Sequence, residues 1–133
     1  MPCILIVDDD RQVREMLRAT LERAGYEIDE AADGQQALAS YARRRPDVAL
    51  VDIIMPEMEG IETILQLRRR DRDARIIAMS GGGHVGPDAY LQSARQCGAS
   101  YAFTKPIDRE ALLRAITDLT ANTDPGLAPG QAA

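Results

Sequence analysis

The sequence predicts an α/β domain built as a three-layer sandwich, in which helices cover both faces of a five-stranded parallel sheet with strand order 2-1-3-4-5. Strand-like and helix-like segments alternate along the chain, and this alternation implies right-handed crossovers between parallel strands. The strand-like segments are short aliphatic runs, which are typical of strands buried on both faces. A chain of 133 residues with 45% apolar side chains suits a single core.

The first strand and helix have the clearest pattern. Residues 3–8 form an aliphatic run that ends in acids, and residues 10–24 repeat apolar side chains at helical spacing before Gly25, the expected C-terminal stop. Asp10 suits the N-cap of this helix, and we interpret it as a cap and not as a metal ligand. The predicted inward face of the helix consists of Val13, Met16, Leu17, Thr20 and Leu21.

The second and third units follow the same order. Residues 26–31 alternate weakly and indicate an edge strand, and Asp33 is a suitable N-cap for the helix that follows. Pro46 separates that helix from the third strand at residues 48–52. A loop at residues 55–60 precedes the third helix, whose apolar residues begin with Ile61, Ile64, Leu65 and Leu67.

The last two units complete the alternation. Residues 75–80 predict the fourth strand, and residues 87–97 predict a helix that Gly98 ends. Residues 101–104 predict the fifth strand, and residues 108–121 predict the last helix. Each predicted strand is therefore followed by a predicted helix.

Composition limits the domain organisation and the partners. The domain is predicted to span residues 1–121, and residues 122–133, rich in proline, glycine and alanine, are predicted to be a disordered tail with no output domain after it. The formal net charge of -5 argues against nucleic acid as the main partner and against an acidic membrane surface. No segment has the pattern of a membrane span or a secretory signal, so we expect a cytoplasmic protein. Cys3 and Cys97 form neither a disulfide framework nor a metal-ligand spacing.

Aspartates crowd the ends of two predicted strands. Asp8, Asp9 and Asp10 directly follow the first aliphatic run, and Asp52 ends the third strand. Because the carboxyl ends of parallel strands meet at one edge of a sheet, these carboxylates should lie close together and repel one another unless a cation is present. Asp8, Asp9 and Asp52 would form an oxygen-only site suited to Mg²⁺.

Two further polar residues are predicted at the same edge, after the fourth and fifth strands. Ser80 offers a hydroxyl group, and Lys105 offers a fixed positive charge. Neither group is needed to hold a metal, but both suit the oxygens of a phosphoryl group that a metal leaves uncovered. A carboxylate can act as the nucleophile in such chemistry and form an acyl phosphate, and Asp52 is the candidate.

The chain resembles the receiver domains of two-component response regulators from about Cys3 to about Ala121. This resemblance implies the flavodoxin-like (βα)₅ fold. Together, at their spacings, its motifs are highly specific. They are Ile4 to Asp10, Val51 to Gly60, Ala78 to Gly81 and Thr104 to Pro106.

The resemblance implies a Mg²⁺-dependent signalling switch. Asp52 would accept a phosphoryl group from a histidine kinase or a histidine phosphotransfer protein. Asp9, Asp52 and the backbone carbonyl of Ile54 would hold Mg²⁺, and Asp8 would bind a water on the metal. Such a domain is not a dedicated enzyme, but it would catalyse its own phosphorylation and dephosphorylation.

The resemblance also implies how the phosphorylated state is read. Ser80 would move toward the phosphoryl group, Lys105 would pair with it, and the peptide bond between Lys105 and Pro106 would be cis. A downstream protein target would bind the face formed by the last two helices and the last strand. Many receivers carry an aromatic switch residue where this chain has Ala102, so we expect the signal to pass through the backbone of residues 81–86 and the following helix.

Three other readings differ in chemistry. A Mg²⁺-dependent phosphatase with an aspartate nucleophile would use Asp8, because Asp8 to Asp10 contains an Asp-x-Asp after the first strand. A phosphorylation-independent adaptor of receiver fold would neither become labelled nor bind Mg²⁺ appreciably. Gly81 to Gly86 satisfies G-x-G-x-x-G, but a dinucleotide site is disfavoured because this segment follows the fourth strand and not the first.

Overall fold

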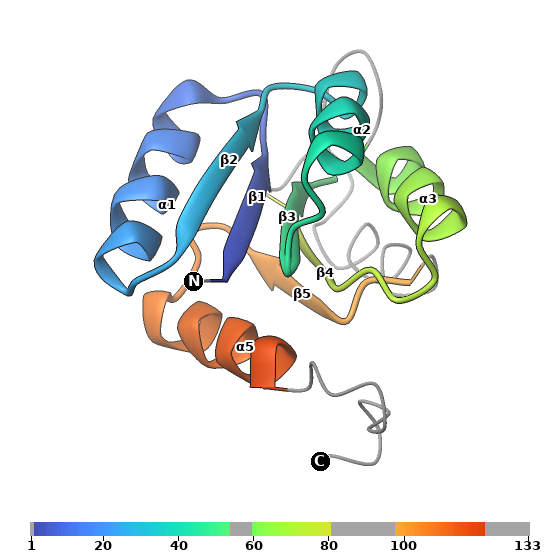
Figure 1. Ribbon diagram of the computed structural model, residues 1–133. Coiled ribbons are helices and arrows are strands. Elements are labelled where there is room, and N and C mark those ends of the chain that lie inside the picture. Colours follow the sequence, from blue (N-terminus) through green and yellow to red (C-terminus); the bar gives the residue numbers. More distant parts are fainter. Residues whose placement is uncertain (1, 54–59, 81–97, 122–133) are drawn as a thin grey trace.

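The computed structural model describes residues 2–53, 60–80 and 98–121, and within these ranges it shows alternating strands and helices (Figure 1). Residues 55–59 of the loop expected at 55–60, the helix expected at 87–97 and the tail expected at 122–133 lie outside the described residues, and Gly60 already belongs to the following helix. The elements are β1 (Cys3–Val7), α1 (Arg11–Arg23), β2 (Glu27–Ala31), α2 (Gly34–Arg43), β3 (Val48–Asp52), α3 (Gly60–Arg70), β4 (Ile76–Ser80), β5 (Tyr101–Thr104) and α5 (Arg109–Ala121).

The strands form one parallel sheet with the order β2-β1-β3-β4-β5, so the predicted fold class and strand order are confirmed. In the register of β1 and β3, Val7 lies beside Val51. The residues that follow these two positions, Asp8 and Asp52, therefore lie at the same level of the sheet. At the other side of β3, Asp52 lies beside Met79 of β4. The register thus gathers the predicted site at one edge of the sheet.

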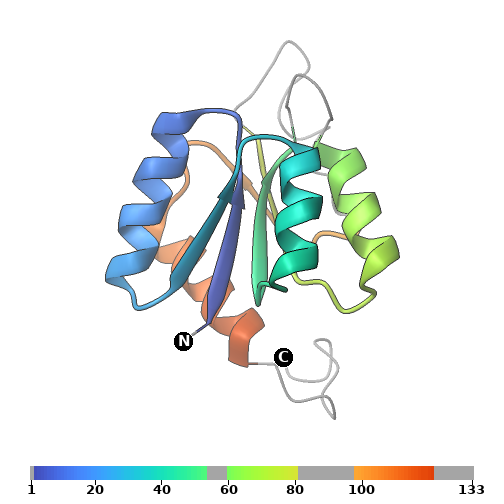
Figure 2. The ribbon, with the colours of Figure 1, turned by 45° about the horizontal axis from the view of Figure 1, so that its top comes forward.

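Helices cover both faces of the sheet, as two views of the ribbon show (Figures 1 and 2). Alternate residues of β1 point to opposite faces: Leu5 and Val7 belong to the core cluster under α2 and α3, whereas Ile4 and Ile6 belong to the cluster under α1 and α5. All four of these side chains are at most 1% exposed. An unbroken aliphatic strand is stable here because neither of its faces meets water.

The predicted helix caps are confirmed for α1 and α2. The Asp10 side chain accepts a hydrogen bond from the backbone N–H of Gln12, and the Asp33 side chain accepts one from that of Gln36. Each cap satisfies a donor that the first helical turn leaves without an intrahelical partner. Gly25 follows α1 with a φ of 97°, a left-handed conformation that glycine adopts without steric cost.

One apolar residue predicted on an inward face lies on the surface instead. Met16 of α1 is 56% exposed, whereas its neighbour Leu17 is buried. A helix that packs on a flat sheet buries only a narrow stripe, and a residue one position away is rotated about 100° from it. The prediction for Met16 was therefore wrong by a single position on the helix. In α3, Leu65 is 38% exposed, whereas its neighbour Ile64 is buried.

The described helices are also informative about membranes. None of them is long and apolar enough to cross a bilayer, within the ranges that the structure covers.

Candidate functional site

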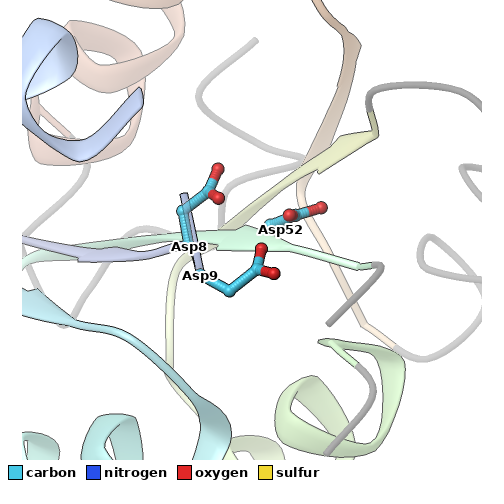
Figure 3. Close-up of side chains that lie close together, drawn as sticks. All are labelled: Asp8, Asp9 and Asp52. Carbon is cyan, nitrogen blue, oxygen red and sulfur yellow. The ribbon is translucent and has the colours of Figure 1, made fainter. Parts of the chain in front are cut away.

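Asp8, Asp9 and Asp52 meet at the carboxyl edge of the sheet, although the last two are 43 positions apart in sequence. One carboxylate oxygen from each lies within 4.8 Å of the others, and Figure 3 shows the side chains emerging from neighbouring strand ends. Asp8 is fully buried, Asp52 is 5% exposed, and Asp9 is exposed. The predicted acidic cluster therefore forms, with one member open to solvent.

Lys105 lies against this cluster because the chain after β5 returns to the same edge. The backbone N–H of Lys105 donates to the carbonyl of Ser80 over 2.8 Å, which extends the pairing of β4 and β5 by one residue. Its Nζ lies 2.7 Å from Oδ2 of Asp8 and 3.5 Å from Oδ2 of Asp52. The peptide bond from Lys105 to Pro106 is cis, as the resemblance implied.

The electrostatic environment keeps Lys105 charged. Burial lowers the pKa of this lysine, but the hydrogen bond to Asp8 and the negative charges of Asp52 and Asp8 outweigh burial and raise the pKa above its ordinary value. The ammonium group therefore stays protonated at neutral pH. It compensates part of the repulsion among the three carboxylates.

Asp8 is held by both of its carboxylate oxygens. Oδ1 accepts the backbone N–H of Asp10 over 2.9 Å, and Oδ2 accepts from Nζ of Lys105. Its backbone is held as well: the N–H donates to the carbonyl of Ala31, and the carbonyl accepts from Nη1 of Arg14 over 2.8 Å. A buried carboxylate is tolerated only with such partners.

Ser80 ends β4 beside Thr104 of β5 and is fully buried. The backbone carbonyl of Ser80 joins this residue to Lys105, so the two predicted phosphoryl-binding residues are adjacent in the sheet. Ile54, whose carbonyl was expected to hold the metal, lies outside the described residues.

Gly60 contributes to the site in a way that the sequence analysis missed. A Cβ atom on this residue would lie 2.7 Å from the carbonyl carbon of Asp52 and would also collide with the Cα of Ile53. Only glycine lets the first turn of α3 approach the end of β3 so closely. The available signal was the glycine that follows the sequence Met-Pro-Glu-Met-Glu.

The donor set fits Mg²⁺. Three carboxylates converge, all of their donor atoms are oxygen, and a single ammonium cannot neutralise them. Hard divalent cations prefer such ligands, and Mg²⁺ in particular is bound by one or two carboxylates together with water. In the described part of the chain, this is the one group of three acidic, histidine or cysteine side chains placed to hold a metal.

Comparison with known proteins gives a family and several relatives. The model of the response regulator receiver domain matches residues 4–117. The response regulator MprA of Mycolicibacterium vanbaalenii is 36% identical over 130 residues, which are 98% of this chain and 55% of that relative. MprA of Mycobacterium leprae is 38% identical over 122 residues, which are 92% of this chain and 52% of that relative. The chain therefore spans about half the length of these curated relatives.

Solved structures of similar fold include a receiver domain protein (CheY-like) from Methanospirillum hungatei JF-1, with a TM-score of 0.83 and 28% identity over 91% of this chain and 94% of that one. Another is the response regulator protein TrrA from Thermotoga maritima, solved in complex with Mg(2+)-BeF. It has a TM-score of 0.77 and 31% identity over 90% of this chain and 99% of that one.

Proposed function

The chain belongs to the response regulator receiver domains of two-component signalling, and we propose that it works as a switch by accepting a phosphoryl group on Asp52. One observation supports this most directly. The carboxyl ends of β1 and β3 and the residue after β5 bring three carboxylates and one lysine together. Nζ of Lys105 lies 3.5 Å from Oδ2 of Asp52. An anionic nucleophile beside a fixed cation suits the transfer of an anionic group.

The proposed step exchanges one bond to phosphorus for another. An oxygen of the Asp52 carboxylate forms a bond to the phosphorus of a phosphohistidine. The P–N bond breaks, and its electron pair returns to the imidazole nitrogen of the donor, whose ring keeps a proton on its other nitrogen. The product on this chain is an acyl phosphate.

Asp9 and Asp52, with the carbonyl of Ile54, would hold Mg²⁺, and Asp8 would bind a water on it. The metal, when bound, supplies positive charge for the phosphoryl oxygens. Lys105 supplies a second positive charge from within the protein, and the buried hydroxyl of Ser80 supplies a hydrogen bond from the end of β4. In the relative TrrA, a solved complex with Mg(2+)-BeF is in keeping with this chemistry.

The contacts of Asp8 favour Asp52 as the nucleophile over the phosphatase reading. Both side-chain oxygens of Asp8 already accept strong hydrogen bonds, one from a backbone N–H and one from an ammonium group. Hydrogen bonds of this strength lower the nucleophilicity of the carboxylate that accepts them. Asp52 lies farther from the same ammonium group.

The partners follow from the proposed chemistry. The donor is a histidine kinase or a histidine phosphotransfer protein, and a downstream protein target reads the state at the last two helices and the last strand. On the described part of that face, β5 and α5 line a shallow surface hollow of about 520 Å³. Its walls combine the rings of Tyr101 and Phe103 with the charges of Arg114 and Asp118, and aromatic residues and arginine are enriched at protein interfaces.

Labelling with a small phosphodonor tests the function. The protein is incubated with Mg²⁺ and phosphoramidate, and intact mass spectrometry followed by peptide mapping locates the adduct. We expect one phosphoryl group on Asp52 in the wild type and in Arg114→Gln, and none in Asp52→Asn. Label on Asp8 with turnover of phosphate esters would establish the phosphatase instead. Absence of any adduct together with negligible Mg²⁺ affinity would establish the adaptor.

A further inference from the structure

Arg14 of α1 lies behind the acidic cluster and touches its main chain. Nη1 of Arg14 donates to the backbone carbonyl of Asp8 over 2.8 Å. That carbonyl belongs to the peptide unit that joins Asp8 to Asp9. The guanidinium group therefore holds the peptide unit that directly precedes the Cα atom of Asp9.

A second element holds the guanidinium group in place. Nε of Arg14 donates to Oε1 of Glu30 on β2 over 3.1 Å, and the two side chains are 16% and 24% exposed. The other oxygen of Glu30 accepts from Arg18, one turn further along α1. A guanidinium with two of its donors fixed in different directions has little freedom left, which a lysine could not reproduce.

Asp9 needs this support more than its neighbours do. The Asp8 carboxylate is fixed by Lys105 and by the N–H of Asp10, whereas the Asp9 carboxylate makes no hydrogen bond or ion pair with the residues that the structure describes. Among the described residues, only the backbone constrains the direction of this side chain. On the N-terminal side of Asp9, the backbone is held by the hydrogen bond from Arg14 to the carbonyl of Asp8. On the C-terminal side, it is held by the hydrogen bond from the N–H of Asp10 to Oδ1 of Asp8.

We infer that Arg14 is a positioning residue: its hydrogen bond to the Asp8 carbonyl orients the Asp8–Asp9 peptide and so raises the affinity of the acidic cluster for a divalent cation. The inference rests on the proposed function, because it concerns the same acidic cluster. Arg14 acts through the main chain and is not itself a ligand. Outer-shell groups of this kind commonly tune metal affinity.

Simple electrostatics makes the opposite prediction, which allows a sharp test. Removing a positive charge near three carboxylates should strengthen the binding of a cation, because less repulsion acts on it. If Arg14 orients Asp9, its removal should weaken binding despite the lost repulsion. Arg18 provides a matched control, since it lies on the same helix and pairs with the same Glu30.

The experiment measures Mg²⁺ affinity by calorimetry, without any phosphodonor, in wild type, Arg14→Gln, Arg14→Lys and Arg18→Gln. We expect Arg14→Gln to weaken binding about tenfold, Arg14→Lys to fall between it and wild type, and Arg18→Gln to bind as tightly as wild type or slightly more tightly. Thermal melts in EDTA confirm that each variant is folded at the temperature used. If Arg14→Gln is unfolded, the comparison of Arg14→Lys with Arg18→Gln decides. The inference then requires that Arg14→Lys bind Mg²⁺ more weakly than Arg18→Gln.

A second readout needs no metal. The ¹⁵N chemical shift of the Asp9 amide reports on the hydrogen bond at the carbonyl of Asp8, and in EDTA it should move in Arg14→Gln but not in Arg18→Gln. Equal or tighter Mg²⁺ binding by Arg14→Gln, or equal weakening in both variants, would overturn the inference. Failure of the proposed function is a separate result, namely a wild type that forms no adduct on Asp52.

Discussion

Nζ of Lys105 lies 2.7 Å from Oδ2 of Asp8, across 97 positions of sequence. Lys105 is the only lysine in the chain, and Asp8 is fully buried at the end of the first strand. The fold thus carries its own counter-ion for the acidic cluster. One ammonium group beside three carboxylates leaves room for a divalent cation, so the site is partly neutralised by the protein and open to a metal.

Removing this counter-ion should destabilise the metal-free fold. In EDTA at neutral pH, Lys105→Met is expected to lower the free energy of unfolding by about 2 kcal/mol, because Asp8 loses a charged hydrogen-bond partner while it stays buried. Mg²⁺ should restore part of the loss. Urea titrations with and without Mg²⁺ measure both effects. Arg114→Met, which removes a cation from a pair that is more than 80% exposed, is the control and should change little.

Asp9 and Asp8 should respond oppositely to neutralisation. In EDTA, Asp9→Asn is expected to raise the free energy of unfolding by about 0.5 to 1 kcal/mol, because it relieves repulsion at an exposed position. Asp8→Asn should lower it, because Lys105 then loses its nearest anion. Urea midpoints of the two variants give the comparison. A decrease for Asp9→Asn would show that repulsion within the cluster does not govern stability.

Gly60→Ala tests the close approach of α3 to the end of β3. The added methyl group would collide with the backbone of Asp52 and Ile53, so one of the two elements must shift. We expect a loss of about 3 kcal/mol and slower phosphorylation of Asp52. Gly25→Ala is the control, because it replaces a glycine without causing a steric clash. Gly25 has a positive φ but nothing within 4 Å of a Cβ position, and its substitution should leave the phosphorylation rate unchanged.

The Tyr41 hydroxyl donates to Oδ2 of Asp71 over 2.7 Å and joins the end of α2 to the end of α3. Burial alone would raise the pKa of Asp71, but hydrogen bonds from Arg45 and Tyr41 lower it below the ordinary 3.8. The stability from this carboxylate is therefore present above pH 3.8 and is lost as pH falls through the lower folded-state value. Burial and Asp71 raise the pKa of Tyr41, so its hydroxyl remains a donor throughout.

Tyr41→Phe should accordingly cost about 1 kcal/mol at pH 7, and the difference from wild type should shrink as the pH falls below 3.8. Thermal melts across the acid range provide the measurement. Tyr101→Phe is the matched control, because its hydroxyl bonds to Asp118 at an exposed position and its loss should be smaller. A Tyr41→Phe deficit that stays constant down to the lowest pH would contradict the role assigned to Asp71.

The sequence was enough for the order of the described elements, the strand order and the residues of the acidic cluster. Aliphatic runs that end in Asp8 and Asp52 can be read directly, and the carboxyl ends of parallel strands must share an edge. The N-caps Asp10 and Asp33 were equally accessible, since a cap depends only on residues within one turn.

Tertiary structure alone decided which side chains touch. Helical spacing could not tell Met16 from Leu17, because the buried stripe depends on how α1 lies on the sheet. Three contacts of the site each join separate elements. They are the hydrogen bond from Arg14 to the Asp8 carbonyl, the close approach of Gly60 to Asp52 and the ion pair of Lys105 with Asp8. Local pattern determines which element forms and where it ends, whereas contacts between elements depend on packing distances that no single segment encodes.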